Sequence, residues 1–440
     1  MIKKIHNKIS TDKNLKELLS GSAITFVFKI SGMVLSYLLI YLISKELGAE
    51  GVGFYQIMLQ TLTILGVIFG LGMNISILRY VGQFNNVNEK PKIKLIYRYL
   101  ITILGPVTIL ASIILYFSSD WITETLNKKA EYAQGLKIIA ISLPFFTINQ
   151  VSVEFIRGLK KLKISEFLRS VTRPLIIGMG FLIVKSSPTK IDLIYYLLIS
   201  LVINSLISRF VIWREMKEIP RMAFTFTKVE LFRTSAPMIL SSISSYTFGF
   251  VPIFFLDYFN SQSEVGMYSI AHYLSTLSSL ILIILNTILA PKIAELYWSD
   301  KTSLQKLLTQ SSIIGIIVST IFSFALIAFG HFTLGLFGEE FTSSYYVLVI
   351  LVIAQWINTW AGSVGLVLNM TGNQKSQSII SVATFALLLV IYPLLIINFG
   401  KEGAALGTLI GMAIINLSSL FIAYKKTKLI VAFIPFKLLG

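Results

Sequence analysis

Long apolar runs recur along the chain at nearly regular intervals from Leu18 to Tyr424. A helix of about 20 apolar residues crosses the ~30 Å hydrocarbon core of a bilayer. Surface helices of a soluble domain would carry a polar face, which these runs mostly lack. The pattern therefore predicts an all-α polytopic membrane protein with twelve transmembrane helices. We expect these helices at residues 18–43, 54–79, 95–117, 136–158, 167–184, 192–213, 234–257, 266–290, 307–329, 344–368, 378–397 and 404–424.

Composition leaves little room for anything outside the membrane. The 440 residues are 55% hydrophobic and 13% charged, whereas soluble domains are about 25% charged. The longest segment between predicted spans, residues 214–233, is too short for a nucleotide-binding domain. The chain carries no P-loop, zinc-protease or dinucleotide-binding motif, and three histidines without a cysteine leave few metal ligands. We therefore expect a transporter rather than an enzyme, with no cofactor beyond a coupling ion, H+ or Na+.

The net charge of +17 is better explained by basic loops than by a nucleic-acid partner. With a cytoplasmic N-terminus, 24 Lys and Arg residues fall on cytoplasmic segments and six on outside segments. Lys and Arg concentrate on the cytoplasmic side of membrane proteins. An even number of spans then returns the C-terminus to the cytoplasm. The tail, residues 425–440, mixes Lys with Leu, Ile and Phe and is too short to span, so we expect it at the membrane interface.

Short segments recur at a nearly constant offset between the two halves of the chain. Residues 52–55 read Val-Gly-Phe-Tyr at the start of the second span, and residues 265–268 read Val-Gly-Met-Tyr at the start of the eighth. The end of the sixth span likewise matches the end of the twelfth at almost the same offset. Six spans per repeat give both halves the same topology. We expect two six-helix lobes, residues 1–220 and 221–424, that rock about a central cavity.

Basic side chains inside the predicted spans gather in the first lobe. Lys29 lies well inside the first span, and Arg169 and Arg173, four positions apart, share a face of the fifth. Ionisable groups inside a bilayer cost several kcal/mol and usually face a cavity or a partner. This asymmetry favours a cavity that holds an anion, because Lys and Arg are common partners of phosphate. The offset between the Val-Gly-x-Tyr copies places neutral residues at the matching positions of the second lobe: Ser242, Val382 and Ala386.

Few acidic or titratable residues are placed to couple transport to an ion gradient. Glu154 is the carboxylate well inside a span, and Arg157, three positions later, can pair with it. Asp257 lies at the end of the seventh span and His272 within the eighth. Glu154, Asp257 and His272 are candidates for binding H+ or Na+. The alternatives are a structural ion pair for Glu154 and helix packing for His272.

Three stretches resemble the opening of bacterial polysaccharide flippases. They are Phe28-Lys29-Ile30-Ser31-Gly32, residues 43–55 (ISKELGAEGVGFY) and residues 70–80 (GLGMNISILRY). These flippases translocate O-antigen and capsule repeat units and belong to the multidrug/oligosaccharidyl-lipid/polysaccharide exporter superfamily. The local similarity covers about residues 20–85, and the twelve-span topology extends it along the chain.

The resemblance implies two six-helix lobes that form a V around a central cavity. It implies a substrate of oligosaccharide on polyprenyl pyrophosphate, flipped from the cytoplasmic to the outer leaflet of the bacterial inner membrane. Lys29 matches a position where the first helix of the family often carries a basic residue. The residues of this sequence itself, rather than the family, suggest Arg157, Arg169 and Arg173 as the rest of the expected pyrophosphate site. Membrane lipid would surround the lipid tail, and a glycan polymerase and a chain-length regulator are candidate partners.

Two other functions remain open at this point. A cation-coupled multidrug exporter of the same superfamily would carry acidic rather than basic residues in its cavity. A membrane glycan polymerase or acyltransferase would show a large outside loop or a catalytic membrane histidine. The outside loops predicted here are short, and His272 has no evident catalytic partner in the sequence.

Overall fold

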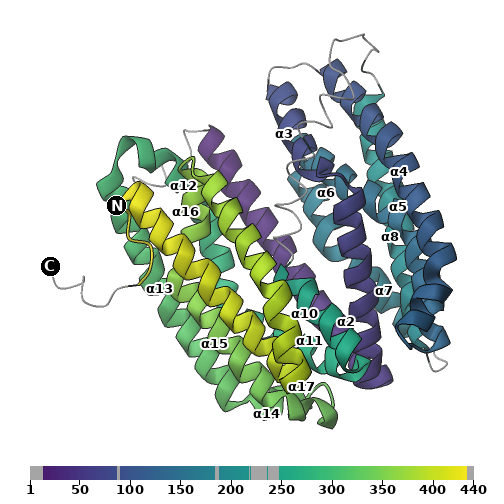
Figure 1. Cartoon of the computed structure of the whole chain (residues 1–440). Coiled ribbons are helices and arrows are strands. Elements are labelled where there is room, and N and C mark those ends of the chain that lie inside the picture. Colours follow the sequence, from purple (N-terminus) through teal and green to yellow (C-terminus); the bar gives the residue numbers. More distant parts are fainter. Residues whose placement is uncertain are drawn as a thin grey trace. The chain divides into compact units, whose positions relative to one another are not determined.

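Every regular element of the computed structural model is a helix within the residues it describes, which are 13–86, 90–183, 188–217, 219, 235 and 247–433 (Figure 1). In this part of the chain, eight helices are long and apolar enough to cross a membrane. The protein is thus a multi-pass membrane protein. The eight helices cover Thr25–Phe69, Pro91–Thr125, Ala130–Gly158, Lys190–Met216, Gln262–Ser299, Lys301–Ala328, Glu339–Ala361 and Gln374–Thr427.

Ten of the twelve expected spans lie wholly or mainly on these eight helices, because the first and the last helix each carry two. The second expected span continues past Phe69 into α3 (Met73–Asn86), and the tenth continues past Ala361 into α16 (Val364–Met370). The fifth expected span, residues 167–184, is divided between shorter helices and is not among the eight. Half of the seventh, residues 234–257, lies outside the described residues; its described end is α10 (Thr247–Phe259). The number of long helices is therefore smaller than the number of expected spans for two reasons. A kink joins two spans into one long helix, and a break divides a span into helices too short to be counted.

Two glycines kink the longest helices. Gly48 in α2 (Lys13–Phe69) has φ +63° and Gly400 in α17 (Gln374–Thr427) has φ +52°, values that favour glycine. A glutamate accepts the backbone N–H that follows each kink: Glu340 Oε1 from Ala49 at 2.7 Å, and Glu264 Oε2 from Lys401 at 3.1 Å. A Cβ on either glycine would lie 2.8 Å from that same carboxylate oxygen. The kinks are therefore set by glycine and locked by a charge-assisted hydrogen bond.

The chain divides into two compact units, each built from two stretches of sequence. Unit 1 is Met1–Leu42 with Thr61–Ser242, and unit 2 is Ile43–Gln60 with Ile243–Gly440. Helix α2 thus contributes its middle part, residues 43–60, to unit 2 and its ends to unit 1.

Unit 1 is organised around α5, which packs against α3, α4 and α8. Met73, Leu100 and Phe155 are among the fully buried side chains of its core. Thr189 and Asp192 form a capping box that starts α8. The other elements of unit 1 are α3 (Met73–Asn86), α4 (Lys90–Thr125), α5 (Ala130–Gly158), α6 (Leu162–Glu166), the π-helix η1 (Phe167–Val171), α7 (Thr172–Ile183) and α8 (Lys190–Met216).

Unit 2 is organised around α15 and α17, which pack against each other and against α11, α13 and α16 (Figure 1). After α17, the described part of the tail turns back onto this unit: Leu429 and Val431 are buried, and Ile430 exchanges two hydrogen bonds of 2.8 Å with Gln305. Residues 434–440 lie outside the described residues. The other elements are α11 (Gln262–Thr276), η2 (Leu277–Ser279), α12 (Leu280–Ser299), α13 (Lys301–Ala328), α14 (Gly330–Gly335), η3 (Glu339–Ser344), α15 (Tyr345–Ala361) and α16 (Val364–Met370).

The two copies of the repeated Val-Gly-x-Tyr segment meet inside unit 2. A Cβ on Gly53 would overlap the Gln262 carbonyl and lie 3.1 Å from the Gly266 nitrogen. Reciprocally, a Cβ on Gly266 would overlap the Ala49 carbonyl and lie 3.0 Å from the Gly53 nitrogen. The glycine of each copy is therefore required by the backbone of the other, because only glycine lets two helices approach this closely.

Candidate functional site

The four basic residues expected at an anion site all belong to unit 1. Lys29 lies on α2, Arg157 at the end of α5, Arg169 in η1 and Arg173 in α7. They differ in their surroundings: Lys29 and Arg169 are exposed, whereas Arg157 and Arg173 are half-buried. The segment that carries Arg169 and Arg173 departs from a regular α-helix, which determines what each can reach.

The π-turn of residues 167–171 is stabilised by the neighbouring helix. A π-helix closes i→i+5 hydrogen bonds and disturbs the regular i→i+4 ladder, so backbone carbonyls need other donors. The carbonyl of Leu168 accepts from Asn204 Nδ2 of α8 at 3.0 Å and from Thr172 Oγ1 at 2.8 Å. Thr172 Oγ1 also lies 2.9 Å from Asn204 Oδ1, and Asn204 is buried. A side-chain amide thus holds the π-turn in place from α8.

Two of the four cations are compensated by carboxylates. Glu154 Oε1 lies 2.5 Å from Arg169 Nη2, and Glu154 Oε2 lies 3.7 Å from Arg157 Nη1. The expected pairing of Glu154 with Arg157 is present, and Arg169 joins it across the helices. Glu166 Oε1 lies 4.0 Å from Arg157 Nε. The result is a balanced network of two acids and two bases that ties α5 to α6 and η1.

Glu166 is the member of this network that sequence reasoning missed. It lies in residues 159–166, which the hydropathy pattern assigns to a loop, yet its side chain is 1% exposed. Its Oε2 atom has no hydrogen-bond partner among the described residues. The available signal was its spacing of three from Arg169, which indicates a helical continuation of the fifth span.

Lys29 and Arg173 have no compensating acid in the described part of unit 1. Neither makes an ion pair or hydrogen bond with a described residue. Lys29 lies beside the contact between α2 and η1: the Phe28 and Phe167 rings are 6.0 Å apart, and a Cβ on Gly32 would lie 2.5 Å from the Ser170 carbonyl oxygen. Unit 1 therefore presents an exposed ammonium next to the arginine-bearing π-turn, with charge available for an anion.

The three candidates for ion coupling do not lie in one unit. Glu154 is in unit 1, whereas Asp257 and His272 are in unit 2. Asp257 is 3% exposed in α10 and is engaged by neighbouring groups. His272 in α11 stacks on the Tyr268 ring with centroids 6.0 Å apart, as expected for a helix-packing residue.

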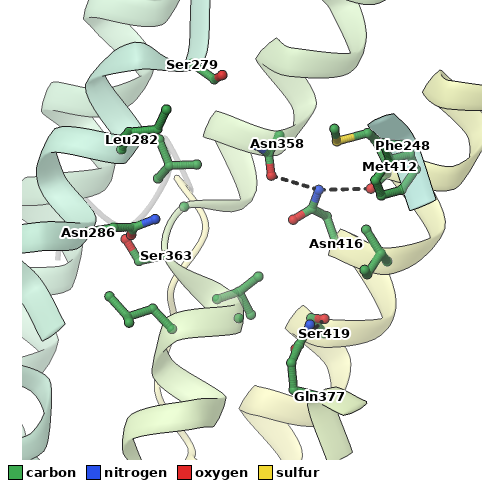
Figure 2. A pocket seen from close by; sticks show the side chains of 16 residues that line it. Phe248, Ser279, Leu282, Asn286, Asn358, Ser363, Gln377, Met412, Asn416 and Ser419 are labelled. Atoms are coloured by element: carbon green, nitrogen blue, oxygen red, sulfur yellow. Dashed lines mark hydrogen bonds between the residues drawn. The ribbon is translucent and has the colours of Figure 1, made fainter. Parts of the chain in front are cut away.

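Unit 2 contains a pocket of about 340 Å3 whose polar side chains are uncharged (Figure 2). Residues of α10, α12, α15, α16 and α17 line it. Asn416 Nδ2 donates to Asn358 Oδ1 at 3.2 Å, and Ser419 Oγ donates to Gln377 Oε1 at 3.0 Å. The Oδ1 atom of Asn286 is buried without a hydrogen-bond partner among the described residues. The residues of the lining that carry side-chain amides or hydroxyls are Ser279, Asn286, Asn358, Ser363, Gln377, Asn416 and Ser419.

The pocket of unit 2 suits a different ligand from the cations of unit 1. Amide and hydroxyl groups donate and accept hydrogen bonds without a net charge, which matches a neutral, hydroxyl-rich group. These amides, unlike the ionisable residues of the spans, were not predicted as site residues. Their signal was present, because Asn and Gln within apolar helices are commonly used for hydrogen bonds between helices or to a ligand.

Comparison with known proteins connects this architecture to a family. A model of the family described as "Polysaccharide biosynthesis protein" matches residues 18–297. The chain is 25% identical over 408 residues to a low-salt glycan biosynthesis flippase, Agl15, of Haloferax volcanii, described as probable, covering 90% of this chain and 82% of that one. It is 22% identical over 378 residues to a protein of Shigella flexneri named "Putative O-antigen transporter", covering 83% of this chain and 87% of that one.

A solved structure shares the fold. An inward-facing multidrug resistance MATE family transporter of the MOP superfamily matches with a TM-score of 0.70 and 13% identity, over 92% of this chain and 98% of the other. At this identity the likeness concerns the fold alone.

Proposed function

The chain belongs to the polysaccharide biosynthesis protein family, and we propose that it flips a polyprenyl-pyrophosphate-linked oligosaccharide repeat unit across the membrane. In this proposal it is a glycan flippase, a transporter and not an enzyme. The names of its relatives, a glycan biosynthesis flippase and an O-antigen transporter, support this class. The flipped unit would serve assembly of a surface polysaccharide such as O-antigen or capsule.

The observation that carries the proposal is the uncompensated positive charge of unit 1. Lys29 lies in a candidate membrane span and Arg173 in the apolar helix α7, and neither has an acidic partner among the described residues. A cation inside the hydrocarbon core of a bilayer costs several kcal/mol unless an anion or water accompanies it. A pyrophosphate group would supply that anion during passage, with Arg157 and Arg169 adding the guanidinium N–H groups that Glu154 leaves free.

The uncharged pocket of unit 2 supports a sugar subsite. Asn286, Asn358 and Gln377 offer amide donors and acceptors of the kind that sugar hydroxyls use, and Phe248 adds an apolar face. In this proposal the neutral glycan binds the pocket of unit 2, while the lipid tail stays in membrane lipid.

The transport cycle in this proposal is alternating access between two six-helix lobes, residues 1–220 and 221–424, with twelve spans in all. The repeated Val-Gly-x-Tyr segments and the helix kinks at Gly48 and Gly400 support this arrangement. The loop charge bias supports cytoplasmic termini. Movement from the cytoplasmic to the outer leaflet of a bacterial inner membrane rests on the resemblance to bacterial polysaccharide flippases. H+ or Na+ coupling through Glu154 belongs to the same proposal, as do a glycan polymerase and a chain-length regulator as partners.

A multidrug exporter of the same fold is less compatible with these charges. A cavity for cationic drugs needs acids without basic partners. Glu154 and Glu166 are both within 4.0 Å of an arginine nitrogen.

The test is flipping by purified protein. Wild-type chain and a Lys29→Ala/Arg173→Ala variant are reconstituted in equal amounts into vesicles that contain a polyprenyl-pyrophosphate-linked oligosaccharide with a labelled sugar. A membrane-impermeant glycosidase then measures how fast inner-leaflet sugar becomes accessible. We expect the double variant to flip at least about tenfold more slowly than wild type. A variant with Lys29→Arg in place of Lys29→Ala should recover part of the rate. The control Lys375→Ala, which changes an exposed residue, should match wild type. Equal rates for wild type and the double variant would remove these cations from the mechanism.

A further inference from the structure

A second pocket, which lies in unit 1 and has a volume of about 400 Å3, is formed between the start of α4 and the end of α8. Lys94, Tyr97 and Arg98 line it from α4, and Arg209 and Trp213 line it from α8. None of the four residues assigned to the pyrophosphate contributes to it. Its role is therefore separate from the substrate site proposed above.

The basic side chains of this pocket differ in whether they have hydrogen-bond partners. Lys94 Nζ donates to the carbonyls of Met216 at 3.0 Å and Ile219 at 2.6 Å, and so stabilises the C-terminal end of α8. Arg98 and Arg209 are exposed and make no ion pair or hydrogen bond with any described residue. No acidic side chain is among the described residues that line the pocket.

The neighbouring acid among the described residues, Glu215, is already paired, and the N-terminal end of α4 is positive. Glu215 on α8 lies 2.5 Å from Lys161 Nζ. Helix α4 begins at Lys90, has no acidic residue in its first turn, and places Lys94 close behind. The N-terminal end of a helix carries partial positive charge, so a lysine there adds to it rather than balances it. An anion in the pocket would relieve this repulsion.

The apolar part of the pocket indicates that the anion carries a lipid tail. Leu95, Ile101 and Ile212 line the same pocket as the two arginines. Trp213 is 56% exposed beside Phe210, with ring centroids 6.2 Å apart. Tryptophan and tyrosine concentrate at the headgroup level of membranes, and the loop charge bias places the ends of α4 and α8 on the cytoplasmic side.

We propose that the pocket formed by Arg98, Arg209 and Trp213 binds the phosphate headgroup of an anionic phospholipid from the cytoplasmic leaflet. Basic pockets between membrane helices on the cytoplasmic side are suited to such headgroups. The two guanidinium groups contact the phosphate, Trp213 lies at the interface, and the apolar residues receive the first part of an acyl chain. A bound lipid would join α4 to α8 at the end where Lys94 already links them.

The test is native mass spectrometry of the detergent-purified full chain with added phosphatidylglycerol or phosphatidylcholine of the same acyl chains. We expect wild type to retain one phosphatidylglycerol at least tenfold more tightly than an Arg98→Ala/Arg209→Ala variant. Arg214→Ala removes an arginine of α8 that does not line the pocket, and should bind as wild type does. The Arg98→Lys/Arg209→Lys variant should keep part of the affinity for phosphatidylglycerol, because the positive charge at both positions remains.

Three results would overturn the proposal: equal phosphatidylglycerol binding by wild type and the double Ala variant, equal retention of phosphatidylcholine, or displacement of the phospholipid by inorganic phosphate alone. Polyprenyl phosphate is the fourth arm. If polyprenyl phosphate binds more tightly than phosphatidylglycerol in this competition, the pocket belongs to the substrate and the proposal is wrong. Because the readout is lipid retention, the outcome is independent of whether the protein flips glycans.

Discussion

Replacing Gly53 by Ala should destabilise unit 2 more than any surface change, because it inserts a methyl group between two helix backbones. Gly53 in α2 faces Gln262 and Gly266 of α11. The new Cβ would overlap the Gln262 carbonyl oxygen and lie 2.7 Å from its carbonyl carbon. Ordinary contacts begin at 3.4 Å, so the helices must separate by at least about 0.7 Å, the difference between these two distances.

The obstructing atoms are backbone, and no rotamer change can move them. Inserting methylene groups into a packed core typically costs 1–3 kcal/mol, so we place Gly53→Ala near the upper end, at about 3 kcal/mol. One kcal/mol shifts the unfolding midpoint of a 150–250-residue domain by about 2–4 °C. Unit 2 is of this size, and we expect a decrease of about 6–12 °C.

The assay is the loss of monodisperse protein on heating, followed by fluorescence-detected size-exclusion chromatography at one heating rate. Gly266→Ala should give a similar decrease, because its Cβ meets the Ala49 carbonyl. The double variant should cost less than the sum, since one separation relieves both overlaps. Gly249→Ala is the matched control in unit 2: its Cβ would meet nothing within 4 Å, and alanine favours a helix. A Gly53→Ala protein as stable as this control would refute the close helix contact.

Three further outcomes can be measured. Asn204→Ala should destabilise unit 1 by about 0.5–1.5 kcal/mol, since the Leu168 carbonyl of the π-turn loses its amide donor and keeps the Thr172 hydroxyl; Asn204→Leu, which fills the volume, should not restore thermal stability. Glu154→Gln should lower the response of flipping to an imposed H+ or Na+ gradient at unchanged protein level, and an undiminished response would leave Glu154 a structural partner of its arginines. Hydrogen bonds from the side chain and backbone N–H of Ser303 lower the pKa of Asp300, the N-cap of α13. The stabilisation by Asp300 is therefore complete at neutral pH and lost as the pH falls through its folded-state pKa, so the difference in thermal midpoint between wild type and Asp300→Asn should shrink from pH 7 to pH 3; a constant difference would contradict this reasoning.

The sequence by itself determined the class of protein. Apolar runs long enough to span a bilayer need no knowledge of their neighbours, because lipid imposes the same requirement on every helix. The residues around Lys29 and Gly53 indicated the polysaccharide flippases, and the family match over residues 18–297 confirms that resemblance. The i,i+3 spacing of Glu154 and Arg157 also identified their ion pair, since both lie on one helix.

The hydropathy pattern did not predict the structure of the fifth span correctly. Residues 162–183 form two short helices joined by a π-turn, and their order depends on Asn204, which lies on another helix, α8. A hydropathy window reads only neighbouring residues, so it cannot detect a carbonyl that is satisfied from another helix. The same limit placed Glu166 in a loop.

Only the tertiary structure decided which distant residues meet. The Glu154–Arg169 pair joins α5 to η1, the amides around Asn416 gather from several helices, and Gly53 lies against Gly266 although the two come from different halves of the chain. Burial, ion pairing and close backbone contact depend on distances between helices. Those distances follow from the packing of whole helix faces against one another. Neither the hydropathy of single residues nor their spacing along one helix predicts that packing.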